Sequence, residues 1–356
     1  MYNNVYQMNT KIKLFAKFIF PALISALFLF CSCSSREGSG GVNVLYSFTT
    51  FNKVRHAFGG GFTQSSAAIF TFPVKQENIE KIKMFIKLAC PAGGCNAWDV
   101  FANIKVKDPA TSKWLEIGRY ITPYGVDNSQ LTKGFMIDVT DFKSLLTGEV
   151  NLRSFIETWG ADGWLLTLNF EITEGIPDYK YYAVSEIIQY NNNTLEGIPY
   201  GEPNNFVVDK SITIPLNTEK SCLRTIITGW GHATPSDPDG RPCAEWCFRT
   251  NKILISGVHK FTHVMNGCGC STNPVHPQGG NWSPDRAGWC PGMEVPVRTD
   301  VFESSMAGTS FSYKYQLEPW TNNFKSTADN QHAYYAISSF VVVKSNTSFT
   351  TSPVVN

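Results

Sequence analysis

The stretch LLTLNFEI, residues 165–172, carries an apolar side chain at every second position from Leu166 onward. A strand turns successive side chains to opposite faces, so this alternation predicts a β-strand with one buried face. Similar short runs, bounded by turn residues, occur at residues 70–72, 82–88, 100–106, 114–120, 135–139, 182–184 and 340–343. We therefore expect an all-β protein, with one short helix at residues 141–146 as the exception.

Length and composition predict two β-sandwich domains. A chain of 356 residues, at roughly 150 per domain, suggests two domains. Its 28 Gly and 19 Pro, with a charged fraction of 17%, argue against long helices and against disorder. Gly175-Ile176-Pro177-Asp178 interrupts the alternation, so we place an N-terminal domain at residues 45–175 and a C-terminal domain at residues 178–356. A sandwich or jelly roll suits each half, because two sheets can bury each other's apolar faces.

The charge balance excludes one class of function. Lys and Arg number 30, Asp and Glu number 29, and the formal net charge is +1. Non-specific nucleic-acid binding requires a broad positive field, and this balance does not supply one. We therefore expect no nucleic-acid partner.

The N-terminus reads as an export signal. Three lysines precede an apolar run at residues 18–30, which is too short to cross a bilayer as a helix. We interpret residues 1–32 as a signal peptide and residues 33–44 as a flexible tether. Cys33 follows Ser32 as the lipid-bearing cysteine follows a small residue in bacterial lipoproteins. The expected location is the cell envelope, as a lipoprotein, or the exterior after ordinary cleavage.

Eight of the ten cysteines lie outside the leader, and export favours their oxidation. Three pairs are close in sequence, although spacing alone cannot fix connectivity, and Cys222 and Cys268 are left over. Zinc is the alternative, since Cys268 and Cys270 lie near three histidines, but the spacing does not match paired CxxC motifs. We expect no metal and no cofactor. The close pairs are Cys90 with Cys95, Cys243 with Cys247, and Cys270 with Cys290, and the histidines are His259, His263 and His276.

Three distant segments each place a carboxylate beside a tryptophan. Trp98-Asp99 follows a short loop between cysteines, and Glu245 precedes Trp246 inside the sequence CAEWC. In FIETW, residues 155–159, the period of two is expected to put Glu157 and Trp159 on one strand face. A single segment of this kind is usually a solvated strand end. Together the three predict a sugar-binding cleft that contains acids, because aromatic faces bind the apolar faces of sugar rings.

Two chemistries fit acids beside a bound sugar. A pair of carboxylates can cleave a glycosidic bond, and a carboxylate can activate water to hydrolyse an amide. The spacing of these residues does not decide between them.

Long runs of the chain resemble the bacterial peptide-N-glycosidase F family, amidases that remove N-linked glycans from asparagine. The similarity extends over residues 51–355 and includes the runs KIKMFIK at 81–87, IDVTDFKSLL at 137–146, CAEWCFRT at 243–250, PDRAGWCPGM at 284–293 and YAISSF at 335–340. The resemblance implies two jelly-roll domains side by side, with the active-site cleft at their interface. It also implies that the three close cysteine pairs are disulfides.

The resemblance assigns roles residue by residue. It implies that Asp99 is the principal catalytic residue, that Glu245 acts through a bridging water, and that Glu157 helps to hold the reducing-end sugar. Substrate contacts are implied for a further group of cleft residues. They are Trp98, Trp159, Trp230, Trp246, Trp289 and Arg286.

Two positions depart from the family pattern. The family has an arginine after the catalytic aspartate and a tryptophan after Thr-Pro-Tyr, whereas this chain has Val100 and Gly125. We expect the activity to be retained, and the loss of a guanidinium and an indole near the sugar either to relax or shift the glycan preference or to weaken binding.

The sequence thus leads to one hypothesis and two alternatives. Asp99, as general base, takes a proton from water that attacks the side-chain carbonyl of a glycosylated asparagine, and Glu245 orients that water. The expected substrates are N-linked glycoproteins or glycopeptides, and the expected enzyme is a monomer. The alternatives are a non-catalytic glycan-binding lipoprotein and an endoglycosidase.

Overall fold

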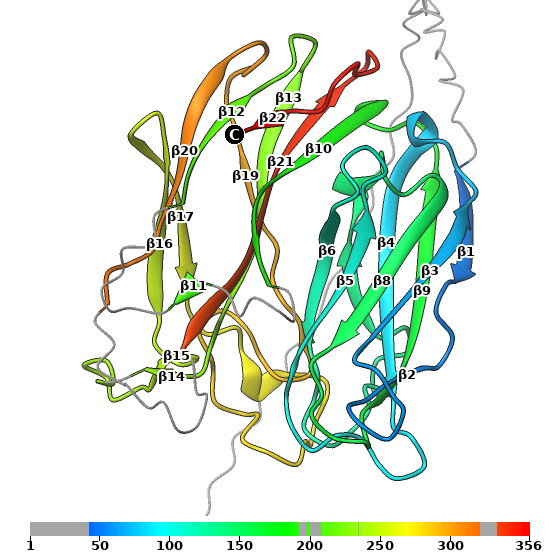
Figure 1. The fold of residues 1–356 in the computed structure, drawn as a ribbon, viewed down its shortest axis with the longest axis vertical. Helices are drawn as coiled ribbons and strands as arrows, with labels where there is room; N and C mark the ends of the chain where they lie inside the picture. Colours follow the sequence, from blue (N-terminus) through cyan, green and yellow to red (C-terminus); the bar gives the residue numbers. More distant parts are fainter. Residues whose placement is uncertain (1–42, 192–197, 200–207, 234, 321–332) are drawn as a thin grey trace, which may run out of the picture. The chain divides into compact units, whose positions relative to one another are not determined.

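Strands joined by turns make up nearly all the regular structure in the computed structural model, which describes residues 43–191, 198–199, 208–233, 235–320 and 333–356 (Figure 1). This confirms the all-β prediction. None of the helices in these ranges is long and apolar enough to span a membrane. The predicted signal peptide, Cys33 and most of the tether lie outside the described residues. In the described ranges the helical elements are three 3-10 turns, η1 Gln76–Asn78, η2 Thr140–Phe142 and η3 Cys270–Thr272.

Two five-stranded sheets are built mainly from the first half of the chain. One has the order β1-β9-β4-β7, with β2 also paired to β9, and the other has the order β18-β6-β5-β8-β3. The strands are β1 Val44–Thr49, β2 Val54–His56, β3 Ser65–Phe72, β4 Ile79–Ala89, β5 Phe101–Lys107, β6 Trp114–Ile121, β7 Phe135–Asp138, β8 Gly148–Ile156, β9 Trp164–Glu174 and β18 Met293–Glu294.

The alternation that predicted a strand at residues 165–172 is reproduced in β9. Every second side chain from Trp164 to Ile172 is fully buried, and the intervening ones are partly exposed. The buried face belongs to one apolar cluster with Ile104 of β5 and Leu152 of β8, which lie in the other sheet. The two sheets therefore form a sandwich, because each covers the apolar face of the other.

A second sandwich is formed by the second half of the chain. Its sheets have the orders β10-β21-β13-β19, with β11 also paired to β21, and β17-β16-β20-β12-β22. A separate apolar cluster, with Leu223 of β13 and Tyr313 of β20, fills the space between them. The strands are β10 Tyr181–Tyr190, β11 Ile198–Pro199, β12 Val208–Thr213, β13 Lys220–Trp230, β16 Arg249–Ile255, β17 Val258–Met265, β19 Arg298–Val301, β20 Ser310–Gln316, β21 Tyr334–Ser345 and β22 Val354–Val355, and a small ladder joins β14 His232–Ala233 to β15 Cys243–Ala244.

A buried polar network joins the two sandwiches, which belong to one compact unit. The guanidinium of Arg119, on β6, donates twice to the Glu116 carboxylate, with both N–O distances 2.9 Å. It also donates to Thr228 Oγ1 of β13 at 2.8 Å and to the Ala336 carbonyl of β21 at 2.7 Å. Buried charges are tolerated only when paired and hydrogen-bonded, so this network requires both halves to be in place.

The predicted helix at residues 141–146 is wrong. Only Thr140–Phe142 forms a 3-10 turn, and the amides of Lys143 and Leu145 donate to the carbonyls three residues earlier. Lys143 is buried, and its ammonium donates to the carbonyls of Ile79 and Tyr179. Tertiary contacts therefore hold the segment in a series of turns. The predicted break at residues 175–178 falls between the end of β9 and the start of β10.

Candidate active site

A disulfide loop delivers Asp99 to the start of β5. Cys90 and Cys95 are bonded, as the resemblance implied. Asn96 fixes the chain that follows, since its Oδ1 accepts the Trp98 amide at 3.1 Å and its Nδ2 donates to Asp162 at 2.9 Å. The side chain of Asp99 is only 11% exposed. Its Oδ2 has no hydrogen-bond partner among the described residues, so a lone pair is available to a water or substrate proton.

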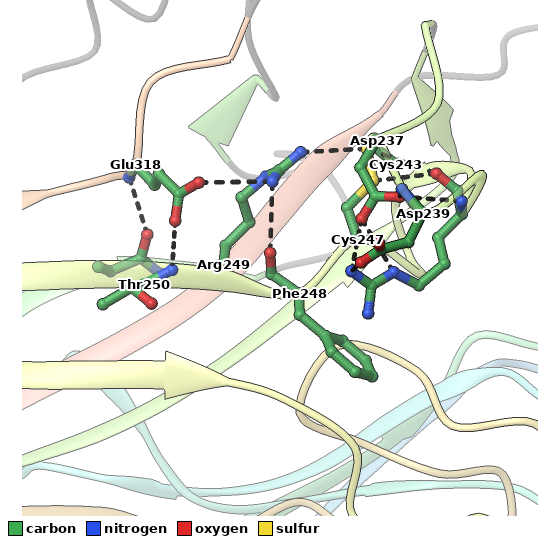
Figure 2. Close-up of polar contacts among 10 residues, drawn as sticks. Asp237, Asp239, Cys243, Cys247, Phe248, Arg249, Thr250 and Glu318 are labelled. Carbon is green, nitrogen blue, oxygen red and sulfur yellow. Dashed lines mark hydrogen bonds and ion pairs between the residues drawn. A yellow bond between two sulfur atoms is a disulfide. The ribbon is translucent and has the colours of Figure 1, made fainter.

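A second disulfide loop presents Glu245. Cys243 and Cys247 are bonded, and the Glu245 amide donates to the Gly231 carbonyl at 3.2 Å. The guanidinium of Arg249 supports this loop from the side of β16 (Figure 2). It contacts Cys243 Sγ at 3.2 Å and the carboxylate of Glu318 at 3.4 Å. Tight backbone and disulfide constraints thus limit where the Glu245 carboxylate can go.

Arg286 joins the two acids. Its Nε lies 3.1 Å from Glu245 Oε1, and its Nη2 lies 3.5 Å from Asp99 Oδ2. The guanidinium is fully buried and packs 4.3 Å from the centre of the Trp246 ring. Two carboxylates that are 146 positions apart in the sequence therefore share one cation in a site largely shielded from water.

Burial raises the pKa of Asp99 to about 7, and the negative charge of Glu245 adds to the rise. The Arg286 cation and the hydroxyl of Tyr124 oppose it. A carboxyl group whose pKa lies near neutrality can both take up and release a proton at physiological pH. The structure thus gives Asp99 the electrostatics of a general base.

Two residues of this site were missed from the sequence. Tyr124 accepts a hydrogen bond from Arg286 Nη2 at 3.1 Å and interacts with Asp99. His232 places its Nε2 3.5 Å from Glu245 Oε2. Tyr124 ends the sequence Thr-Pro-Tyr before Gly125, and His232 follows Gly-Trp-Gly at residues 229–231, but neither segment contains a pattern that points to a carboxylate.

The predicted tryptophans differ in exposure: Trp98 and Trp159 are exposed, Trp230 and Trp246 are partly buried, and Trp289 is buried. Trp98 is 68% exposed and Trp159 is 67% exposed, so both rings are accessible to a sugar. Trp289 is 1% exposed, and a direct sugar contact for its ring is therefore wrong. It stacks under Trp230, with ring centres 4.6 Å apart, and its Nε1 donates to the Gly229 carbonyl. Arg286 is likewise fully buried, so neither its side chain nor that of Trp289 is exposed to a sugar. Both pack behind the exposed part of the site.

The predicted common face of Glu157 and Trp159 is also wrong. β8 ends at Ile156, and the Thr158 amide turns back to donate to the Ile156 carbonyl at 2.9 Å. Beyond that turn the period of two no longer applies. Trp159 lies instead against Phe58, with ring centres 5.5 Å apart. Glu157 remains beside the start of β5, two residues after Asp99, since its amide donates to the Phe101 carbonyl.

The third predicted disulfide, Cys270 with Cys290, is present, and Cys222 and Cys268 are free thiols. Cys270 and Cys290 cluster with Asp285, but disulfide sulfurs are not thiolate ligands. His263, a ligand of the zinc alternative, instead contacts Asp300 at 2.8 Å. The described residues therefore do not assemble the zinc site that was weighed from the sequence.

The structure shows what surrounds the two positions, Val100 and Gly125, that depart from the family pattern. Val100 is buried in the core of the first sandwich, and its amide donates to Thr122 Oγ1. Gly125 has φ +66°, in the left-handed region, and its amide donates to the Asn96 carbonyl. A residue with a side chain would be strained at position 125 in this conformation.

Comparison with known proteins identifies the family of both halves of the chain. The family model described as "Peptide-N-glycosidase F, N terminal" matches residues 68–172, and the one described as "Peptide-N-glycosidase F, C terminal" matches residues 202–342. The chain is 51% identical, over 308 residues, to peptide-N(4)-(N-acetyl-beta-D-glucosaminyl)asparagine amidase F of Elizabethkingia miricola, and the alignment covers 86% of each protein.

Solved structures give the same result. The fold is similar to that of PNGase F from Flavobacterium meningosepticum, with a TM-score of 0.83, 50% identity, and coverage of 88% of this chain and 99% of that one. PNGF-II shares the fold at 15% identity, with a TM-score of 0.65 and coverage of 85% of this chain and 66% of that one. The two family models, the 51% identity and the similar fold lead to one conclusion: the chain belongs to the peptide-N-glycosidase F family.

Proposed function

We propose that this protein hydrolyses the amide bond between a glycan and the side chain of asparagine in N-linked glycoproteins, releasing the intact glycan. The observation that carries the proposal is the pair Asp99 and Glu245 held by one buried arginine. The relative with 51% identity is also named as an amidase.

The geometry supports a defined role for each residue. Asp99 Oδ2, buried and without a hydrogen-bond partner among the described residues, takes a proton from water as that water attacks the amide carbonyl. Glu245 orients the water, and Arg286 keeps both carboxylates in place. The proton then passes from Asp99 to the leaving nitrogen as the carbon–nitrogen bond breaks. The products are an aspartate and a glycosylamine, which loses ammonia in water.

Proton transfer accounts for only part of the expected rate. General-base catalysis contributes roughly a hundred- to ten-thousandfold. Orientation of the sugar must contribute more, and the accessible rings of Trp98 and Trp159 are placed to provide it. Glu157, beside the start of β5, is proposed to hold the reducing-end sugar.

One assay tests the reaction. A denatured glycoprotein is incubated with the enzyme in heavy-oxygen water, and the glycosylation site is analysed by mass spectrometry. An amidase leaves an aspartate that carries one heavy oxygen. A single sugar left on asparagine would identify an endoglycosidase, and an unchanged glycoprotein would identify a glycan-binding protein.

Organisation and location complete the proposal. We propose that each sandwich is a jelly roll; the strand order supports this, since β3, β4 and β5 alternate between the sheets of the first sandwich. The proposed domains are residues 45–175 and 178–356, and the enzyme is a monomer.

A lipid on Cys33 would tether the enzyme to the cell envelope. Lipid labelling of wild type and of Cys33→Ser tests this location directly.

A further inference from the structure

Among the described residues, the charge around Asp99 and Glu245 is unbalanced when both acids are ionised. Asp99 and Glu245 together carry two negative charges when ionised, and Arg286 supplies one positive charge between them. Because this site is largely shielded from water, an uncompensated negative charge is costly there. The negative charge of Glu245 also raises the pKa of Asp99, because it opposes the ionisation of that carboxyl group.

His232 lies where a second cation would balance this charge. Its Nε2 is 3.5 Å from Glu245 Oε2, whereas Arg286 approaches the other oxygen, Oε1. The His232 side chain is 56% exposed, so it can exchange protons with solvent. The pKa of His232 is raised, first by its hydrogen bond to Glu245 and also by the charge of that carboxylate, while burial opposes the rise.

The backbone, and not the ion pair, holds His232 in place. His232 pairs with Ala244 in the β14–β15 ladder, next to the bond from the Glu245 amide to the Gly231 carbonyl. Gly229 packs so closely on the Ala244 carbonyl that an added Cβ would lie 2.3 Å from that oxygen. Replacing the exposed imidazole should therefore change the charge beside Glu245 and leave the backbone unchanged.

Within the part of the chain that the structure describes, the other charged groups near this loop have partners of their own. Tyr124 lies on the Asp99 side and is neutral, because burial raises its pKa. Asp285, next to Arg286, accepts the amides of Gly269 and Cys270. Figure 2 shows that Arg249 is directed to Glu318 and that Asp237 and Asp239 lie together; Arg241 bridges these two aspartates.

We propose that His232 is a positioning residue whose imidazolium pairs with the Glu245 carboxylate and offsets its negative charge beside Asp99. The inference rests on the amidase function proposed above. Below its raised pKa His232 is protonated, and its charge favours the ionised, basic form of Asp99. As the pH rises through the pKa of His232 this help is lost, but Asp99 is then increasingly ionised by the pH itself.

The consequence is a loss of activity confined to the acid side. In His232→Gln the acid limb of the kcat/KM profile should move to higher pH by about 0.5 to 1 pH unit. The shift is modest because the Glu245 side chain separates His232 from Asp99. At pH 6, where Asp99 is mostly protonated, kcat/KM should fall about 3- to 10-fold. At pH 9 the variant should match wild type. His232→Lys, which keeps a cation, should restore the acid limb.

The test measures kcat/KM of glycopeptide cleavage from pH 5 to 9 for wild type, His232→Gln, His232→Lys and the control His259→Gln, an exposed histidine on β17. A loss of equal size at every pH, or no loss at any pH, overturns the proposal. An NMR titration of the His232 ring provides a readout without catalysis: its pKa should fall in Glu245→Gln, and an unchanged value also overturns the proposal. If wild type releases no glycan, the amidase function fails, while the titration still decides the role of His232.

Discussion

Replacing Asp99 by asparagine should abolish activity and at the same time stabilise the protein. In the folded state the pKa of Asp99 is about 7, against an ordinary value of 3.8 for an aspartate in water. The folded protein therefore binds a proton more tightly at this site than the unfolded chain does. Between pH 4 and 7 stability falls as the pH rises, because ionising Asp99 in its buried site is unfavourable.

The size of the effect follows from the shift. About three pKa units at 1.36 kcal/mol each give a cost on the order of 4 kcal/mol above pH 7. Asparagine has the shape of the protonated acid and never ionises, so Asp99→Asn should avoid most of this cost. The general-base contribution is lost, and turnover should fall at least a hundred- to ten-thousandfold.

Urea denaturation of wild type and Asp99→Asn at pH 4 and pH 8 measures the difference directly. We expect the variant to be more stable at pH 8 and the two proteins to be equally stable at pH 4. Asp209→Asn, at an exposed carboxyl on β12, is the control and should show no comparable gain. A variant that is less stable at pH 8, or a gap that persists at pH 4, would refute the electrostatic account of Asp99.

Three further predictions concern the rest of the site and the disulfide framework. Arg286→Lys keeps the positive charge, but a lysine ammonium cannot span both carboxylates, so the pKa of Asp99 should rise. In steady-state assays kcat/KM should fall at least about 10-fold at pH 7 and recover in part at pH 9. A loss of kcat/KM that does not depend on pH would contradict this. Glu157→Gln should raise KM more than it lowers kcat in steady-state assays, because its proposed role is sugar binding. Cys270→Ser with Cys290→Ser opens a loop of 20 residues and should cost about 3 kcal/mol in urea denaturation, and an unchanged midpoint would contradict a stabilising role.

The strands could be predicted from the sequence because their signal is local. The alternation at residues 165–172 follows from the side-chain period of a strand, and β9 buries the expected face. The same local rule failed at Trp159, because the strand ends three residues earlier and the chain turns. It also failed at residues 141–146, where the buried Lys143 binds carbonyls from outside the segment.

The site depended on more than local pattern. The acid and tryptophan motifs marked Asp99, Glu245 and Glu157, whereas Arg286 and the role of each acid came only from the family resemblance. Tyr124 and His232 carried no such mark, and Trp289 was given a surface role although its ring is buried. Solvent exposure and hydrogen-bond partners are properties of neighbours in space, and the sequence order does not reveal them.

The sequence alone therefore determined the all-β class, the break near residue 175 and the residues able to carry the chemistry, since composition and period two act over short distances along the chain. Only the tertiary structure decided which of those residues act together. The pKa of Asp99 depends on burial and on charges from Glu245 and Arg286, which lie far away in the sequence and within a few ångströms in space. Coulomb energy and desolvation depend on distances through the folded protein, so they exist only once the two sandwiches are assembled.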